Sequence, residues 1–188
     1  IWLLAIAYIF VYIIRFGAED WMIMYLTKAK ANISLADATN MIASLPLVGI
    51  CGTVCAGLIS DKVFKGKRAP VNLIYLIGIV AMLILLKFNT INALNYVIIG
   101  LLGAFTYGPQ MMIGGLCAVE SSSKKVASAA TGFTGTFGYI GAVLSATGTG
   151  FMVDKFGWNG ALAFWLVSAI ICIVICFILW QNEKKRTC

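Results

Sequence analysis

The chain has 188 residues, of which 61% are hydrophobic and 11% are charged, and its net charge is +7. A soluble domain of this length cannot bury so much apolar surface, so a soluble globular class is excluded and lipid is the expected solvent. The absence of His and of a G-x-x-x-x-G-K-[ST] loop argues against an enzyme and against an ATP-driven motor. Five of the six Cys lie in apolar segments without hard or basic neighbours and are interpreted as apolar packing, and Cys188 in the polar tail as an ordinary reduced thiol. No metal site and no cofactor are expected.

Six apolar segments follow one another along the chain, and each has about the 20 residues that a helix needs to cross a bilayer. They cover about residues 2–27, 40–60, 69–87, 94–119, 127–153 and 160–180. The alternation typical of a lipid-facing barrel strand is absent. The sequence therefore predicts an all-α membrane protein with six transmembrane helices.

The first segment carries a guanidinium near its middle, at Arg15. An arginine at that depth costs about 2.5–3.5 kcal/mol on insertion scales, so it should face the protein interior or a water-filled cavity. Tyr8, Tyr12, Arg15 and Glu19 follow spacings of 4, 3 and 4, which is one helical face, whereas Asp20 falls off that face. Two hypotheses remain open: Arg15 binds an anionic substrate through its planar fork, or an Arg15–Glu19 pair only holds helices together.

A charged loop, "DKVFKGKR" at 61–68, follows the second segment. Asp61 ends a helix and is expected to pair with one of the basic residues that follow, Lys62 and Arg68 among them, or with a neighbouring helix end. Such a pair could be a latch between helices that depends on the conformational state. The alternative is that these charges only control topology.

The fourth and fifth segments supply further polar candidates. Tyr107 and Gln110 flank Gly108 and Pro109 about midway along the fourth segment, where the proline removes an amide donor and favours a bend. Tyr139 is the large polar residue of a glycine-rich fifth segment. These side chains, together with Tyr12, are candidates for lining a transport site, and packing or a structural kink is the alternative.

The polar connections form two alternating sets that differ in positive charge. Four basic residues belong to one set: Lys28, Lys30, Lys87 and Lys155. Nine belong to the other: Lys62, Lys65, Lys67, Arg68, Lys124, Lys125, Lys184, Lys185 and Arg186. The positive-inside rule makes the richer set cytoplasmic, with both ends of the chain on that side. The positive charge is thus interpreted as topology and contact with lipid headgroups, not as nucleic-acid binding.

An internal repeat links the two halves of the chain. "GLISDK" at 57–62 and "GFMVDK" at 150–155 share the pattern G-x-x-x-D-K, 93 residues apart. Each ends its predicted helix, one on the cytoplasmic side and the other on the external side, so the relation is inverted. The same offset carries Arg15 to position 108, next to Tyr107. Two inverted three-helix units are the plan of half a transporter. Since the chain begins at Ile1 inside an apolar run, we interpret it as a piece of a longer protein.

Several of these motifs resemble a known family. "GLISDKVFKGKR" (57–68) resembles the loop signature of the major facilitator superfamily, and the chain resembles the C-terminal six helices of its organophosphate:phosphate antiporters. The similar stretches are "FVYIIRFGAEDW" (10–21), "YGPQMMIG" (107–114), "GFTGTFGYIG" (132–141) and "DKFGWNG" (154–160). The resemblance implies the C-terminal half of a twelve-helix fold, monomeric at full length, in a bacterial plasma membrane.

The resemblance also implies an activity and roles for individual residues. Members exchange inorganic phosphate for an organophosphate, such as glycerol 3-phosphate or a sugar phosphate, by alternating access, and each half supplies an arginine to the phosphate. Arg15 matches that arginine, and Tyr107 and Tyr139 match tyrosines along the pathway. Asp20 matches the acidic position of the glycerol-3-phosphate branch and Glu19 that of the hexose-phosphate branch. The alternatives are a membrane sensor for sugar phosphate on the same fold and a facilitator half in which Arg15 is structural.

Overall fold

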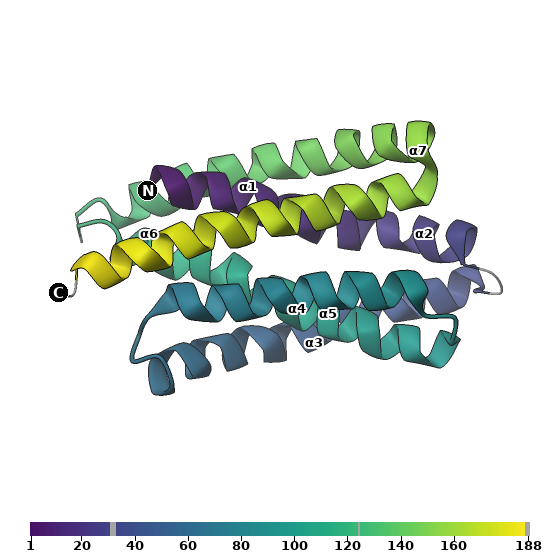
Figure 1. Ribbon diagram of the computed structural model, residues 1–188, viewed down its shortest axis with the longest axis horizontal. Helices are drawn as coiled ribbons and strands as arrows, with labels where there is room; N and C mark the ends of the chain where they lie inside the picture. Colours follow the sequence, from purple (N-terminus) through teal and green to yellow (C-terminus); the bar gives the residue numbers. More distant parts are fainter. Residues whose placement is uncertain (31–32, 124, 187–188) are drawn as a thin grey trace.

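The computed structural model describes residues 1–30, 33–123 and 125–186, with the side chains of 183–186 left out. The described residues form helices and loops without a strand, which confirms the all-α prediction. The elements are α1 (Trp2–Phe16), η1 (Gly17–Trp21), α2 (Met22–Ala29), α3 (Leu35–Lys62), α4 (Arg68–Phe88), α5 (Asn92–Met111), η2 (Met112–Cys117), α6 (Ala118–Glu120) and α7 (Ala127–Arg186). They lie side by side as an elongated bundle (Figure 1).

The long element α7 contains two of the predicted segments. Gly157 has φ 65° and ψ −167°, a backbone conformation that is essentially restricted to glycine. The chain reverses there, so that residues 127–156 and 158–186 run as two antiparallel arms (Figure 1). Five described helices are long and apolar enough to cross a membrane, and the last of them, Ala127–Asn182, includes both arms. The structure therefore has the six segments that hydropathy predicts.

Helix ends differ most from the predicted ones at the start of α3 and at the end of α7, which continues to Arg186 beyond the predicted end near residue 180. Helix α3 begins at Leu35, whereas the sequence predicted a start near residue 40. The side chain of Ser34 accepts a hydrogen bond of 3.1 Å from the backbone N–H of Asp37, which caps the helix. The apolar segment predicted from the sequence began later in the chain and left out this capped first turn.

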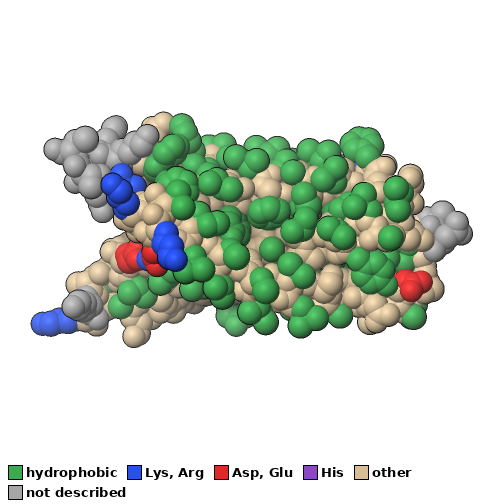
Figure 2. Space-filling view, turned by 90° about the horizontal axis from the view of Figure 1, so that it is seen from below, with side chains coloured by type: hydrophobic (Ala, Val, Ile, Leu, Met, Phe, Trp, Pro, Cys, Tyr) green, Lys and Arg blue, Asp and Glu red, His purple; other side chains and the backbone are tan. Residues whose placement is uncertain are grey.

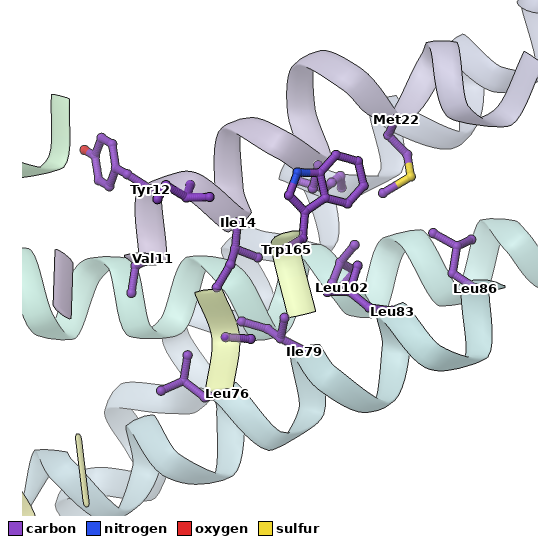
Figure 3. Close-up of a cluster of buried hydrophobic side chains, with 14 of the residues drawn as sticks. Val11, Tyr12, Ile14, Met22, Leu76, Ile79, Leu83, Leu86, Leu102 and Trp165 are labelled. Carbon is purple, nitrogen blue, oxygen red and sulfur yellow. The ribbon is translucent and has the colours of Figure 1, made fainter. Parts of the chain in front are cut away.

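A shared apolar core holds the segments together. Trp165, on the second arm of α7, is 1% exposed and lies among Ile14 of α1, Leu76 and Ile79 of α4 and Leu102 of α5 (Figure 3). The outer surface is apolar as well: on the face shown in Figure 2, hydrophobic side chains cover the middle and charged side chains lie towards the ends. That distribution is the one expected for a bundle whose sides contact lipid.

The two predicted three-helix units are alike in two respects. Their first segments, α1–η1–α2 and α5–η2–α6, each contain a π-helical turn, at Gly17–Trp21 and at Met112–Cys117. Each first segment also packs along the second segment of the other unit: α1 lies against α7, and α5 lies against α3. π-helical turns are rare and are frequent at functional sites, so their matching positions support the repeat.

The connections alternate between the two ends of the bundle. Ile1, the described end of α7 and the connecting residues 63–67, 121–123 and 125–126 lie at one end, which we call the basic end. Residues 30 and 33–34 and the connection 89–91 lie at the other end with Gly157 (Figure 1). Of the residues assigned to the richer basic set, Lys124 lies outside the described residues, as do the side chains of Lys184, Lys185 and Arg186.

Candidate functional site

Arg15 lies at the middle of the first segment, between aromatic rings. Its side chain is 21% exposed, so it is neither sealed in the core nor free in solvent. The guanidinium carbon lies 5.1 Å from the ring centre of Phe16 and 5.2 Å from that of Tyr107, with Tyr12 at 5.8 Å. Rings at these distances stabilise a cation and restrict the plane of the guanidinium. Arg15 is thus held in one orientation where α1 passes into η1.

Glu19 joins this guanidinium to the fourth segment. Its Oε1 lies 3.1 Å from Nε of Arg15 and accepts a hydrogen bond of 2.6 Å from the hydroxyl of Tyr107 on α5. Two donors from different segments therefore meet on one carboxylate oxygen. Charge-assisted hydrogen bonds of this kind are stronger than neutral ones, and they become stronger still where water is partly excluded.

Asp20, the other acidic candidate, lies apart from this contact. Its side chain is exposed, and the ion pairs of the described residues join Arg15 to Glu19 and not to Asp20. The π-helical turn begins only at Gly17, so the four-residue step from Arg15 to Glu19 still keeps one face. Gly17 also allows close packing, because a Cβ there would lie 2.4 Å from Nε1 of Trp165.

The tyrosines of the predicted stripe are buried on one side of Arg15. Tyr8 donates a hydrogen bond of 3.3 Å to the hydroxyl of Tyr12, and their side chains are 7% and 8% exposed. Tyr139, on the first arm of α7, is 67% exposed and its ring centre lies 6.0 Å from that of Tyr12. Aromatic side chains therefore continue from Arg15 to an open face of α7.

Gln110 and Tyr107 lie one turn apart on α5. Gln110 is half-buried, and its Oε1 has no hydrogen-bond partner within the described part of the chain. Tyr107 packs tightly on α3, where a Cβ at Gly49 would lie 2.9 Å from its ring. A buried acceptor without a partner is costly, and a ligand with a donor group would satisfy it.

A second charged cluster lies at the basic end. Nη1 of Arg68 lies 2.6 Å from Asp61 and also donates to Ser60, while Nη2 lies 3.1 Å from Oε1 of Glu120. Arg68 thus connects the end of α3 to α6 across the start of α4. Lys62 is exposed and lies outside this cluster.

Three participants were not identified from the sequence. Phe16 follows Arg15 directly, so its aromatic character next to a buried cation was the available signal. Glu120 lies 52 residues from Arg68, and Gly49 lies 58 residues from Tyr107, so no short spacing indicates either contact. Across the described residues, no three carboxylate, thiol or imidazole side chains gather in a way that could hold a metal ion.

The sequence of the chain is similar to those of known membrane transport proteins. A sequence model of the Major Facilitator Superfamily matches residues 1–146. The chain is 38% identical over 98% of its length to a glycerol-3-phosphate transporter of Bacillus subtilis, covering 42% of that protein. It is 34% identical over its whole length to a probable hexose phosphate transport protein of Chlamydia pneumoniae, covering 41% of it.

A third relative has a different description. The membrane sensor protein UhpC of Salmonella typhimurium is 36% identical over 99% of the chain, which covers 42% of that protein. The chain therefore spans about two fifths of the length of the curated relatives that it matches.

Proposed function

Because the chain belongs to the Major Facilitator Superfamily and is similar to organophosphate transporters, we propose that the complete protein transports a small organophosphate across a membrane in exchange for inorganic phosphate. The substrate class is glycerol 3-phosphate or a sugar phosphate. The chain supplies one half of the cavity, as the C-terminal six-helix half-domain, and an N-terminal six-helix half supplies the other. Alternating access then arises from rocking of the two halves around the site.

The observation that carries this proposal is the contact of Arg15 with Glu19 and Tyr107. A guanidinium at mid-membrane depth matches the bidentate geometry of a phosphate group. When the site is empty, Glu19 neutralises Arg15; when phosphate arrives, it competes with Glu19 for the guanidinium. Tyr107 and Tyr12 lie next to Arg15, and Tyr139 lies next to Tyr12. Together with Gln110, one turn from Tyr107, these side chains would contact the organic part of the substrate.

Exchange follows from this competition. Inorganic phosphate and an organophosphate share the charged group that displaces Glu19, so either can favour the closed state in which the site reorients. An empty site keeps the Arg15–Glu19 pair and reorients less readily. The Arg68 cluster, with Asp61 and Glu120, would act at the basic end as a contact that forms in one of the two states.

Orientation and location are part of the same proposal. The connections rich in lysine and arginine would face the cytoplasm of a bacterial cell, and both ends of this chain would lie on that side of the plasma membrane. One full-length chain contains both halves of a cavity, so a monomer would be the working unit.

The test is an exchange assay with the full-length protein. The protein is reconstituted in liposomes loaded with radiolabelled phosphate, and efflux is measured on adding glycerol 3-phosphate, glucose 6-phosphate or phosphoglycerate outside. We expect efflux that depends on one of these organophosphates and is absent from protein-free liposomes. A protein that binds none of them and exchanges no phosphate would refute the proposal.

A second function is favoured by the similarity to the sensor protein UhpC. In that case, the same site would bind an external sugar phosphate and report its occupancy to a partner, with slow or no turnover. Saturable binding of a sugar phosphate without phosphate exchange in the same liposomes would support the sensor, and rapid exchange would exclude it.

A further inference from the structure

A cavity of about 560 Å³ lies at the end of the bundle opposite the basic end. Three chain segments surround it: the end of α2, the connection between α4 and α5, and the reversal of α7 at Gly157, which lie together at the right of Figure 1. Its polar lining consists of Lys30, Lys87, Asn89, Thr90, Asn92 and Asn159. Tyr25 and Trp158, whose rings pack edge to face, supply an apolar wall.

The charge of this lining has one sign. Lys30 and Lys87 are the charged residues among those that line the cavity, and no carboxylate joins them. Asp154 lies three residues before Gly157, but its side chain is exposed and does not line the cavity. Lys30 is half-buried, and burial lowers the pKa of its ammonium group below the ordinary value. A bound anion would offset this cost of burying a cation.

Lys30 and Lys87 both have N–H donors available for a bound anion. An ammonium group carries three N–H donors, and the hydrogen bond from Lys30 to the backbone carbonyl of Asn89 uses one of them. Lys87 is exposed, with its Nζ 5.7 Å from the ring centre of Phe88. Neither lysine forms an ion pair within the described part of the chain.

Further donors lie at the same place. α5 begins at Asn92 without a side-chain cap, and the second arm of α7 begins after Gly157, so the first residues of two helices line the cavity. The fully buried Asn95 accepts a hydrogen bond of 2.8 Å from the lining residue Asn89, and its own Nδ2 has no partner among the described residues. Donor groups other than the two lysines are therefore present next to this cavity.

The cavity is separate from the Arg15 site. Lys30 follows Arg15 by 15 residues along one continuous segment, which corresponds to a separation of about 22 Å along a helix axis. None of the residues that contact Arg15 lines the cavity.

We propose that this cavity is a second anion site, which takes a phosphate group. Tetrahedral phosphate oxygens can accept from two ammonium groups and from the N–H groups of two helix N-termini at once, whereas water would leave both lysines without a counter-charge. Two sources share this chemistry: inorganic phosphate or a phosphate monoester in solution, and the headgroup of an anionic phospholipid. The site rests on the lining of the cavity and does not depend on what the protein transports.

The experiment compares two double variants of the full-length protein in nanodiscs. Lys30→Gln with Lys87→Gln removes both cations of the cavity. Lys28→Gln with Lys155→Gln removes two cations of the same end that do not line it, so the net charge changes equally. Both pairs are made in an Arg15→Gln background, so that binding at the central site does not contribute to the measurement.

One arm uses zwitterionic lipid and measures binding of radiolabelled inorganic phosphate. The other arm uses anionic lipid without phosphate and counts retained anionic phospholipid per protein by mass spectrometry. In one of the two arms we expect the cavity pair to lower binding about tenfold, as for the loss of charge-assisted contacts, and the control pair to change it by less than about twofold. A loss in the phosphate arm identifies a soluble ligand, and a loss in the lipid arm identifies a headgroup.

Two results would overturn the proposal. One is that neither the cavity pair nor the control pair lowers binding in either arm. The other is an equal loss in both pairs, which would assign the effect to the general field of this end. Lys30→Arg with Lys87→Arg keeps both cations and should retain binding, and the single exposed change Lys87→Gln should still lower it if the double variant does not fold.

Discussion

Tyr107 and Glu19 are 88 residues apart in the sequence, and the hydroxyl of Tyr107 donates a hydrogen bond of 2.6 Å to Oε1 of Glu19. The same oxygen lies 3.1 Å from Nε of Arg15. The first segments of the two three-helix units are therefore joined at a single carboxylate. A ligand that displaces Glu19 from Arg15 also alters the contact between the units, which connects binding to movement of the helices.

The shape of the guanidinium should matter as well as its charge. Arg15→Lys keeps the cation but loses the planar fork that matches phosphate, so we expect phosphate exchange by the full-length protein to fall about tenfold or more. The measurement is efflux of labelled phosphate from proteoliposomes, with a thermal unfolding curve of the same preparation as the folding control. Near-normal exchange in a folded Arg15→Lys protein would show that Arg15 is structural.

Neutralising Glu19 should change the affinity for phosphate much more than neutralising Asp20. Glu19→Gln removes the carboxylate that competes with phosphate for Arg15, so phosphate affinity should rise about five- to tenfold while its release slows. Asp20→Asn changes an exposed carboxylate away from Arg15 and should shift the affinity by less than about twofold. Equilibrium binding of labelled phosphate checks both. A larger effect at Asp20 than at Glu19 would contradict the pairing seen in the structure.

The position of the Tyr107 ring depends on the absence of a side chain at Gly49. A Cβ at that position would lie 2.9 Å from the ring, so Gly49→Ala should displace Tyr107 from Glu19 and destabilise the fold by about 1–3 kcal/mol. Gly57 lies on the same helix, and a Cβ there would meet no neighbouring side chain or helix within 4 Å, so Gly57→Ala is the matched control. It should leave stability unchanged or raise it by up to about 1 kcal/mol. Thermal unfolding in detergent compares the two, and equal effects would argue against tight packing at Tyr107.

Arg68 should contribute more to the stability of the fold than Asp61 or Glu120 does alone. Its side chain is 13% exposed and it bonds both Asp61 and Glu120, so Arg68→Gln breaks two ion pairs at once. Asp61 and Glu120 are 62% and 49% exposed, and a pair with so exposed a partner contributes only about 0–1 kcal/mol. We expect the loss of stability in Arg68→Gln to exceed that in Asp61→Asn or in Glu120→Gln, as measured by thermal unfolding in low salt.

Lys62 provides the control for that series. It is exposed and next to Asp61 in the chain, yet it lies outside the cluster, so Lys62→Gln should leave the unfolding temperature nearly unchanged. If Lys62→Gln destabilises the protein as much as Arg68→Gln does, net charge at the basic end and not the specific cluster sets the stability.

The sequence by itself determined the class of protein and the order of its helices. An apolar run of about 20 residues and the bias of lysine and arginine between loops are local properties, so six segments with alternating connections could be predicted without any contact. The helical period likewise placed Tyr8, Tyr12, Arg15 and Glu19 on one face, because neighbours within a helix are set by rise and turn alone.

Only the tertiary structure decided which of those residues meet. Tyr107 reaches Glu19 across 88 residues and Glu120 reaches Arg68 across 52, separations for which no local spacing rule exists. The first turn of α3 also lay outside the segment predicted from hydropathy, and a cap at Ser34 marks where that helix begins. Lys30 and Lys87 come together for the same reason as Tyr107 and Glu19: the packing of distant segments, and not their order in the chain, brings their side chains to one cavity.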